Sequence, residues 1–523
     1  MTNEIKNITI RGGNLQGELR TGDAGVIGAV SGMKIGNKGI PKGWILTELS
    51  IIADIFDVDH KMPKAVDHGV LFISPKDFNG EDNIDFKNAK QISEEDYFRL
   101  SKKCHPDPGD LLFSRIGTIG KVRIVPRSLK FQISYSLCLI KVFNQNIYNK
   151  YLFWLLRSHS IQTQSHKKKR SIGVPDLGLR DIRSFSIPLP PLNEQNRIVS
   201  KIEELFTQLD AGIASLQEVQ DKLFQYRKAV LKHAFEGKLT EAWREAHMDE
   251  IEPASVLLER IREERRKDKK YKELLPVNTE GLPDLPEGWV WVRIKEVGDS
   301  RLGRQRAPKH HNGENMRPYL RVANVYEDRI EASDIKEMNF TPEEFVIYHL
   351  QYGDILLNEG QSKELVGRPA IYRDEVPNAC FTNTLIRFRV YSCLLPEFAL
   401  TVFRGYLHNG KFEKIARWTT NIAHLGGERF ADLEFPLPPM QEQEQIVLEV
   451  NRQLSIIDHL EKEFKLYILQ STQLRQSILK KAFEGRLVPQ DPSDEPASVL
   501  LDRIRQEKLT AEPKKRGRKN HDT

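Results

Sequence analysis

One stretch of the sequence has residue types that could bind a phosphate group, the run Gly117-Thr118-Ile119-Gly120-Lys121. A glycine-rich loop cradles nucleotide phosphates when its spacing is Gly-x-x-x-x-Gly-Lys-Ser/Thr. This run has neither that spacing nor the final Ser or Thr, so a turn between two strands is the favoured interpretation. The pair His310-His311 could suggest a metal, but adjacent histidines do not share one helix face and no third ligand is near them. We therefore expect no metal site.

Motifs for covalent chemistry are also missing from the sequence. It contains no complete phosphate loop of an ATP-driven motor, no Asn/Asp-Pro-Pro-Tyr/Phe run of an amino-methylating enzyme, and no nuclease-like acidic pair followed by lysine in a matching context. The cysteines form no Cys-x-x-Cys, which argues against a zinc knuckle and a disulfide framework; they are Cys104, Cys138, Cys380 and Cys393. We predict that the chain has no catalytic residue.

Two clusters of basic residues could hold phosphate groups by charge and hydrogen bonding. The first is a dense run that Gly173 follows, and the second lies in a loop punctuated by Gly and Pro. The predicted phosphate contacts are Lys167, Lys168, Lys169 and Arg170 in the first cluster, and Arg301, Arg304, Arg306 and Lys309 in the second. For each cluster, a simply solvated loop is the alternative.

The composition is that of a globular protein with a balanced charge. The 523 residues include 39% hydrophobic and 29% charged residues, and the net charge is only +6. A balance this close argues against a purely electrostatic binder but permits localised basic patches. No apolar run reaches the roughly 18 residues that span a bilayer, and the first residues lack the apolar core of a signal peptide. We expect a soluble, cytoplasmic protein of about two to four domains.

The sequence contains an internal duplication. Residues 188–195 return as 436–443 and residues 230–239 as 478–487, both at an offset of 248 positions. Residues 252–262 return as 495–505 at an offset of 243, so the first copy carries five extra connecting residues. Three ordered blocks of this kind do not arise by chance, and they require that the fold be considered as a repeat.

The segments that precede these blocks are related more weakly. Each copy opens with Ile/Leu-Pro-x-Gly-Trp, at residues 40–44 and 285–289, and each has a Gly-Asp-Leu/Ile-Leu run, at residues 109–112 and 353–356. A Leu-Gly pair, at 177–178 and 425–426, comes just before each proline run. The pattern predicts two domains of one fold with different surfaces. Duplication followed by drift is the alternative, but drift does not explain why only the helical segments keep their matches.

Each proline run is followed by a pattern typical of a long helix. Proline cannot continue a helix, and Asn193 can cap the helix that follows the first proline run. Glu194 places a negative charge in the first turn, where the helix dipole favours it, and Gly237 can end the helix. A helix of about 40 residues is about 60 Å long. Two such helices packed antiparallel would cover each other's narrow stripes, whereas a long helix crossing its own domain is the alternative. The predicted coiled-coil residues are Ile198, Ile202, Leu205, Leu209, Leu216, Leu223, Val230, Ile446, Val450, Ile457, Phe464, Leu474 and Ile478.

The globular segments mix short strands with helices. Residues 121–125, 133–142 and 385–390 alternate as half-buried strands do, and residues 151–156 and 396–400 look helical. The predicted fold class is α+β: two related α/β domains separated by two long helices that form an antiparallel coiled coil.

Four motifs occur once in each copy: the openings at Trp44 and Trp289, the Gly-Asp-Leu/Ile-Leu runs, the Pro-Leu-Pro-Pro helix starts and the Ala-Phe-Glu-Gly helix ends. As an ordered double set, they resemble the specificity (S, HsdS) subunit of type I restriction–modification enzymes. The resemblance extends over residues 40 to about 508. Residues 320–325 look like the family's early strand and turn, and residues 72–77 look like a looser counterpart.

The resemblance implies that each globular segment is a target recognition domain that reads one half of a split, asymmetric DNA site. It implies that the helices fix the spacing between the halves and dock methyltransferase subunits, two in number, with restriction–motor subunits joining them. It also implies that the chain is not itself the catalyst, so that S-adenosylmethionine, ATP and magnesium would bind partner subunits and none would bind here. A structural adaptor that binds protein partners through its duplicated domains is the alternative function.

Base readout needs Arg or Lys for guanine and Asn or Gln for adenine. In matching turn positions, the candidates are Lys76, Ser114, Arg115, Asn324, Asn358, Glu359, Gln361 and Lys363. The expected segments are a glycine-rich arm (1–39), the first recognition domain (40–187), a central helical region (188–280), the second recognition domain (281–435), a C-terminal helical region (436–510) and a basic tail (511–523). That tail could contact DNA phosphates or only solubilise the chain.

Overall fold

The computed structural model describes residues 39–127, 129–142, 147–169, 173–267, 273–419 and 421–511. Nearly all of the expected N-terminal arm, nearly all of the basic tail and the predicted phosphate contact Arg170 lie outside these residues. The chain divides into two units. Unit 1 comprises residues 1–205 and 475–523, and unit 2 comprises residues 206–474.

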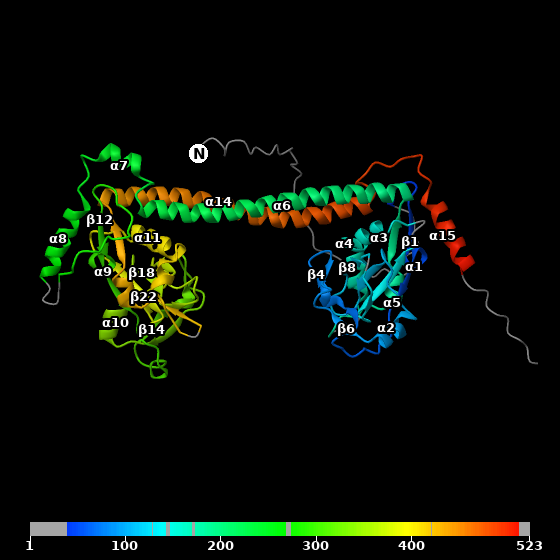
Figure 1. Ribbon diagram of the computed structural model, residues 1–523, viewed down its shortest axis with the longest axis horizontal. Helices are drawn as coiled ribbons and strands as arrows, with labels where there is room; N and C mark the ends of the chain where they lie inside the picture. The colour runs from blue at the N-terminus through cyan, green and yellow to red at the C-terminus, as the bar shows by residue number, and fades with distance from the viewer. Residues whose placement is uncertain are drawn as a thin grey trace, which may run out of the picture. The chain divides into compact units, whose positions relative to one another are not determined.

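Unit 1 contains a domain built on an antiparallel sheet with the strand order β2-β10-β7-β8. Beside it are the sheet β6-β3-β9, in which β3 and β9 run parallel, and the pairs β1-β11 and β4-β5. The strands are β1 Ile45–Glu48, β2 Ala53–Phe56, β3 Val70–Ile73, β4 Phe78–Asn79, β5 Asn83–Ile84, β6 Lys90–Ile92, β7 Leu111–Ser114, β8 Val122–Ile124, β9 Phe131–Ile133, β10 Leu137–Val142 and β11 Ser186–Leu189. The helices are α1 Leu49–Ile52, α2 Glu94–Ser101, α3 Asn149–Leu156, α4 His159–Lys168 and α5 Leu179–Arg183, with a 3₁₀ turn η2 at Pro75–Asp77. Strand β8 and helices α3, α4 and α5 of this domain are labelled in Figure 1.

Unit 2 repeats this topology strand for strand. Its sheets have the orders β13-β22-β18-β20 and β17-β14-β21, its pairs are β12-β25 and β15-β16, and β14 and β21 again run parallel. The strands are β12 Val290–Arg293, β13 Gly298–Leu302, β14 Met316–Leu320, β15 Val325–Tyr326, β16 Arg329–Ile330, β17 Lys336–Asn339, β18 Ile355–Asn358, β20 Pro369–Ile371, β21 Cys380–Phe381, β22 Leu385–Val390 and β25 Glu434–Leu437. The helices are α9 Ile294–Val297, α10 Pro342–Tyr348, α11 Pro396–His408, α12 Lys411–Ile415 and α13 Gly427–Ala431, with 3₁₀ turns η3 Pro308–His310 and η4 Val322–Asn324.

Unit 2 adds one small sheet, formed by β19 Gly360–Gln361, β24 Ala423–His424 and β23 Arg417–Trp418 in that order. In unit 1 the equivalent place holds an isolated bridge between Ile116 and Asp176. The predicted α+β class and the predicted repeat of one fold are confirmed.

The central strands form because their residues are apolar enough to be buried on both faces. All four residues of β7 and of β18 are buried, and α11 packs against β20 and β22 in unit 2. The strands predicted at 121–125 and 385–390 and the helices predicted at 151–156 and 396–400 are confirmed by β8, β22, α3 and α11.

The single strand predicted for residues 133–142 is wrong. Ile133 ends β9, which pairs with β3, whereas Leu137 begins β10 in the other sheet. A turn closed by the hydrogen bond from Leu137 N to Ser134 O carries the chain from one sheet to the other. Alternating apolar residues cannot reveal a crossing of this kind, because the alternation continues through it.

The two long helices are α6, Leu192–Phe235, and α14, Met440–Phe483, each of 44 residues. The predicted cap at Asn193 is wrong, because the helix begins one residue earlier. Pro191 O accepts the first helical hydrogen bond from Gln195 N, and the Asn193 amide instead donates to Asp494. The short helices that follow the long ones are α7 Glu241–His247, α8 Ala254–Arg266 and α15 Ala497–Ala511.

Within unit 2, the C-terminal part of α6 and the N-terminal part of α14 lie side by side and antiparallel (Figure 1). Tyr226 Oη donates to Gln453 Oε1 at 3.0 Å, and Arg227 lies 2.6 Å from a carboxylate oxygen of Asp458. Beyond the end of α6, Thr240 donates a hydrogen bond to Glu442 near the start of α14. From Tyr226 and Arg227 to Thr240, the partners on α14 move from Gln453 and Asp458 back to Glu442, which is the antiparallel arrangement that the sequence predicts.

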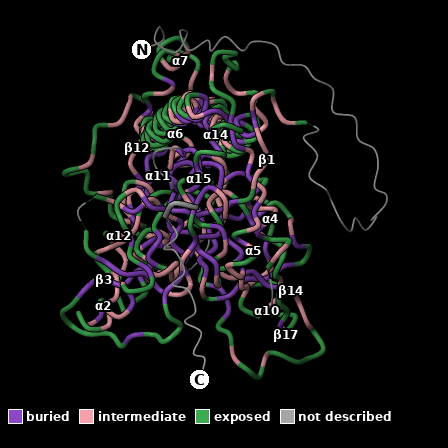
Figure 2. The backbone as a smooth tube through the Cα atoms, turned by 90° about the vertical axis from the view of Figure 1, so that its right-hand side faces the viewer, coloured by how far each residue is buried: buried purple, intermediate pink, exposed green. Residues whose placement is uncertain are grey.

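The predicted coiled-coil residues fall into three groups. Ile198, Ile202, Val230, Ile446, Val450, Ile457 and Ile478 are buried, and Leu205, Leu209, Leu216, Leu223 and Phe464 are half-buried. Figure 2 shows the resulting exposure of α6 and α14, which contrasts with the buried segments of the globular parts. Leu474 is 48% exposed and does not belong to the stripe. Helical spacing from Phe464 leads through Ser471 and Arg475 to Ile478, and it leaves Leu474 to one side.

In each unit, one tryptophan joins the start of one long helix to the end of the other. Trp44 donates its indole N–H to Glu194 Oε2 at 2.9 Å, and Trp289 donates to Glu442 Oε2 at 2.7 Å. The glycines that end the helices, Gly485 and Gly237, lie against the same two indoles with φ of +69°. A Cβ at Gly237 would lie 2.5 Å from Cγ of Pro286, so only glycine fits this left-handed position.

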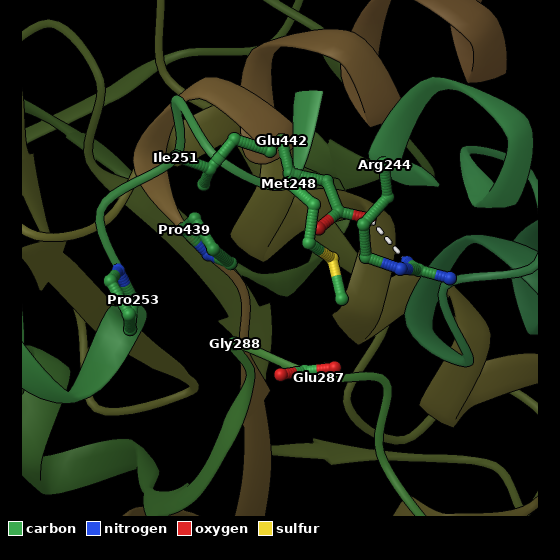
Figure 3. A pocket seen from close by; sticks show the side chains of 8 residues that line it. All are labelled: Arg244, Met248, Ile251, Pro253, Glu287, Gly288, Pro439 and Glu442. Atoms are coloured by element: carbon green, nitrogen blue, oxygen red, sulfur yellow. Dashed lines mark hydrogen bonds and ion pairs between the residues drawn. The ribbon is translucent and has the colours of Figure 1, made fainter. Parts of the chain in front are cut away.

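The two equivalent glutamates have different surroundings. Glu442 is fully buried and also accepts from Thr240 Oγ1 at 2.7 Å and Arg244 Nη1 at 2.6 Å. Figure 3 shows Arg244 and Glu442 pointing toward one another beside a cavity of about 100 Å³. Glu194 Oε1 is buried and has no hydrogen-bond partner in the described part of the chain. Burial raises the pKa of Glu194, with a smaller contribution from Asp494, while Trp44 and Arg197 act in the opposite direction.

Replacing Gly237 by alanine should lower the free energy of unfolding by at least about 1 kcal/mol, because the left-handed backbone and the contact with Pro286 both oppose a Cβ. Gly212 is the matched control, since it lies inside α6 with open space around it. Gly212→Ala should raise the free energy of unfolding by about 0.5–1 kcal/mol. Thermal and urea unfolding of the full chain measure both changes, and equal effects of the two variants would contradict the helix-end role.

Glu442→Gln should lower the free energy of unfolding by about 3 kcal/mol, because it leaves the nearly buried Arg244 without its counter-charge. Urea unfolding of the full chain measures this change.

Glu194→Gln should lower the free energy of unfolding by less than about 1 kcal/mol, or raise it, at neutral pH. Because the folded pKa of Glu194 is raised above its ordinary value of 4.5, folding takes up a proton between these two values, and wild-type stability falls as pH rises through that interval. Urea unfolding across this pH range should show that the slope is reduced in Glu194→Gln, and an unchanged slope would contradict the assignment.

Candidate functional site

Both units place a contacting pair of one acidic and one basic side chain at the end of the central strand. In unit 1, Arg115 follows β7 and its Nη1 lies 3.8 Å from Asp176 Oδ1. In unit 2, Glu359 follows β18 and its Oε2 lies 3.0 Å from His424 Nδ1. The first pair has the basic residue on the strand side, and the second pair has the acidic residue there. We call these two pairs the edge pairs.

The same backbone frame holds both edge pairs. Leu177 N donates to Arg115 O at 2.8 Å, and Leu425 N donates to Glu359 O at 2.8 Å. The bridge between Ile116 and Asp176 in unit 1 corresponds to the antiparallel pair Gly360–His424 in unit 2. The four residues of the edge pairs therefore occupy two structurally equivalent positions, although their charges are exchanged.

Two loops meet at each edge pair, and we call them loop pair 1 (residues 115–121 and 173–177) and loop pair 2 (residues 359–367, 417–419 and 421–425). In loop pair 1, the glycine-rich run from Gly117 to Lys121 is a turn between β7 and β8: Gly120 N donates to Ser114 O and Lys121 N to Ser114 Oγ. The favoured interpretation of that run as a turn is confirmed. The corresponding loop of unit 2 is longer and carries the ion pair of Lys363 with Glu413 at 2.8 Å.

The second loop of each pair presents apolar side chains to solvent. In unit 2 it is the hairpin β23–β24, whose Trp418 is 52% exposed and whose Ile422 is 45% exposed. Arg429 donates hydrogen bonds to His424 O in this hairpin and to Ile415 O in the helix that precedes it. In unit 1, Val174 is 64% exposed at the position that corresponds to Ile422.

The predicted base-reading residues divide by exposure. Lys76 and Lys363 are exposed, and Glu359 and Gln361 are half-buried within loop pair 2. Ser114, Arg115, Asn324 and Asn358 are buried. The structure brings Ser114, Arg115, Asn358, Glu359, Gln361 and Lys363 to the loop pairs, whereas Lys76 and Asn324 lie in or at the 3₁₀ turns η2 and η4.

Asn324 has a structural role that conflicts with base readout. Its Oδ1 accepts from Arg321 N, and its Nδ2 donates to Glu331 O and Asp334 O. Asp77 plays the equivalent part in unit 1, where its carboxylate accepts from Ser74 N at 2.7 Å. With every amide group of the buried Asn324 engaged in this turn, the prediction that it reads a base is wrong for this fold.

The predicted phosphate contacts also divide by exposure. Lys167, Lys169, Arg301, Arg306 and Lys309 are exposed. Lys168 is half-buried and donates to Ser184 Oγ at 2.6 Å. Lys167 and Lys169 lie at the end of α4, on the chain that leads into loop pair 1.

Arg304 is the exception, because it is buried in the fold. Its guanidinium donates to Asn339 O, lies 2.8 Å from Glu344 Oε1 and covers the ring of Phe340. A side chain held in this way is not available to a phosphate, so the prediction for Arg304 is wrong. His310 also lies against this guanidinium, with Nδ1 at 3.0 Å.

Sequence reasoning missed the exposed residues of the second loop, among them Asp176, His424, Arg417, Trp418 and Ile422. A signal was present, because residues 169–178 and 417–426 align without a gap and both end in Leu-Gly. Their pairing with Arg115 and Glu359 depends on contacts between residues about 60 positions apart, which local pattern does not reveal.

All four cysteine side chains are buried within the described ranges. Burial raises the pKa of each of the four cysteine thiols to about 12, so none is a thiolate at neutral pH. Within the described ranges, no three His, Cys, Asp or Glu side chains are placed to hold a metal ion. None of the helices in those ranges combines the length and the apolar character that crossing a bilayer requires.

Comparison with protein families gives one match, which occurs twice. A model described as the type I restriction modification DNA specificity domain matches residues 41–220 and 286–463, which together make up more than half of the chain. Each match covers one globular domain and part of the long helix that follows it.

Individual relatives have low sequence identity to this chain. The chain is 24% identical over 502 residues to the type I restriction enzyme EcoKI specificity subunit of Escherichia coli (strain K12), covering 92% of this chain and 98% of the relative. It is 27% identical over 351 residues to the StySPI specificity subunit of Salmonella potsdam, covering 64% of this chain and 66% of the relative.

Two solved structures share the fold. One, from work on complex assembly and conformational transition of the type I R-M system, has a TM-score of 0.56 and 19% identity over 86% of this chain and 99% of that chain. The other, the HsdS subunit from Thermoanaerobacter tengcongensis, has a TM-score of 0.50 and 20% identity over 87% of this chain and 100% of that chain.

The placement of Arg304 and Arg306 predicts opposite effects of removing them. Arg304→Ala should lower the free energy of unfolding by about 2 kcal/mol or more, because it leaves Asn339 O and Glu344 without their buried donor. Arg306→Ala, at an exposed site, should change it by less than about 0.5 kcal/mol. Urea unfolding measures both, and a stable Arg304→Ala protein would restore this residue as a phosphate contact.

Proposed function

The chain belongs to the type I restriction modification DNA specificity family, and from this premise we propose that it is the DNA-recognising specificity subunit of a type I restriction–modification complex. Each recognition domain reads one half of a bipartite, asymmetric DNA site. By holding the complex on that site, the chain directs methylation and restriction by the partner subunits.

The observation that carries this proposal is the contrast between a repeated frame and different side chains at its loops. The two domains share strand order, backbone hydrogen bonds at the edge pairs and the tryptophan–glutamate contacts. Their loop pairs differ in length, charge and exposed side chains. One frame with two different surfaces suits the reading of two different sequences, because base edges are distinguished by the side chains that meet them.

The chain acts with other subunits and with DNA, and we propose that it supplies no catalytic group. Methyltransferase subunits, two in number, would dock on the helical regions, and restriction–motor subunits would join that core. S-adenosylmethionine, ATP and magnesium would then bind those subunits. The high pKa of the buried thiols supports this division of labour, because it removes the cysteines as nucleophiles at neutral pH.

We also propose that α6 and α14 set the number of base pairs between the two halves of the site. A helix of 44 residues is about 66 Å long. The contacts of Tyr226 and Arg227 with α14 fix the register of the pair within unit 2.

Sequencing of modified bases across the genome, with and without this gene, tests the proposal. Deletion should abolish methylation at a split motif, provided that the partner genes are expressed. Binding of duplex DNA to the purified complex is the companion measurement. A motif that persists after deletion, together with DNA affinity that does not depend on salt, would favour the adaptor function instead.

Lys167 and Lys169 should contribute to affinity without contributing to specificity. Removing both charges should weaken binding to all DNA sequences and reduce the slope of log affinity against log salt by roughly 2, since each phosphate contact contributes about 0.9. Titration of the complex with specific and unrelated duplexes at several salt concentrations measures this. Lys64→Ala with Lys87→Ala, at exposed sites away from loop pair 1, is the matched control and should leave the slope unchanged.

A further inference from the structure

In each edge pair, the residue from the second loop is the more exposed one. The side chain of Asp176 is 45% exposed, whereas that of its partner Arg115 is 6% exposed. The side chain of His424 is 39% exposed, whereas that of Glu359 is 16% exposed. In both units, the inner residue contacts the outer residue and is positioned to orient it.

The inner residue contacts one polar atom of each outer side chain, and the other polar atom of that side chain is left for a partner. Asp176 Oδ1 is buried toward Arg115, so the solvent exposure of this carboxylate belongs to its other oxygen. His424 Nδ1 contacts Glu359, which leaves Nε2.

The surroundings of these two atoms suit a DNA groove. Lys167 and Lys169 precede Asp176, Arg417 precedes His424, and all three basic side chains are exposed. Exposed apolar residues lie two positions before each outer residue, Val174 in unit 1 and Ile422 in unit 2. Basic residues bind the phosphates, and apolar side chains contact thymine methyl groups or base edges.

Building on the proposed function, we propose that Asp176 and His424 read a base at the equivalent step of the two half-sites, and that Arg115 and Glu359 position them. A carboxylate only accepts hydrogen bonds, so Asp176 selects a base pair that presents an amino group in the major groove, such as that of cytosine N4. His424 Nε2 donates to an acceptor such as guanine N7 when the ring is protonated, and it accepts from an amino group when the ring is neutral. With His424 as a donor and Asp176 as an acceptor, the two half-sites have different bases at this step.

This assignment differs from the expectation that Arg115 and Glu359 read bases themselves. Arg115 is too buried for that, and its Nη1 donates to Tyr135 O at 3.0 Å. Glu359 has its carboxylate engaged by His424. Their contribution to specificity is through the orientation of the outer residue.

The test uses cells that lack the native gene, keep the partner genes and express single variants. Sequencing of modified bases should show that Asp176→Asn relaxes or changes one base pair in one half of the split motif, with a roughly tenfold loss of discrimination there. His424→Gln should do the same at one base pair of the other half. Asp67→Asn and His68→Gln, at exposed sites outside the loop pairs and the helical regions, are the matched controls and should leave the motif unchanged.

Positioning is tested separately at Glu359. Glu359→Ala should relax the same base pair as His424→Gln, and Glu359→Gln, which still accepts from Nδ1, should restore discrimination. A purely structural role would not produce that rescue at one base pair. Thermal unfolding and binding to unrelated duplex DNA, both expected to be unchanged, show that each variant is folded.

The outcomes distinguish a failure of the assignment of Asp176 and His424 from a failure of the proposed function. If the wild-type gene produces a split methylation motif and both outer-residue variants keep it unaltered, the assignment of Asp176 and His424 is overturned while the proposed function stands. A variant that alters both halves of the motif also overturns it. If the wild-type gene produces no motif with active partners, the proposed function itself fails.

Discussion

The structure depends on one interaction that occurs twice, the hydrogen bond from an indole N–H to a buried glutamate at the start of a long helix. Trp44 with Glu194 and Trp289 with Glu442 each tie a recognition domain to the helix that follows it. The glycine that ends the other long helix packs on the same indole, because a larger residue has no room there. Each domain thereby holds one helix start and one helix end. This explains why the helix ends remain nearly identical in sequence while the domain surfaces differ.

That arrangement separates the residues that maintain the frame from those that are free to vary. Fixed backbone hydrogen bonds bring the second loop of each domain to the end of its central strand, whichever side chains the loop carries. Arg115 with Asp176 and Glu359 with His424 show that even the sign of the charges can be exchanged within this frame. A protein that must recognise new sequences without losing its partners gains from such a division.

Much of this could be predicted from the sequence, because duplication and apolar periodicity are visible in it. The repeat, the two long helices with their buried residues such as Ile202 and Val450, and the strands β8 and β22 follow from these patterns. The errors arise where tertiary contacts decide. The turn at Ser134 depends on which sheet each strand joins, and the burial of Arg304 depends on Asn339 and Glu344. The exposure of Leu474 follows from a spacing that passes through polar residues, which a search for apolar ones overlooks.

The most direct test of the central claim is the exchange of residues 285–435 for the corresponding domain of a relative with a different DNA site, followed by sequencing of modified bases in cells that contain the partner subunits. Because each domain holds its own contacts to the helix ends, the account predicts that one half of the split motif changes and that the other half and the spacing stay the same. A change in both halves, or in neither, would contradict the claim that each domain reads its half of the site independently.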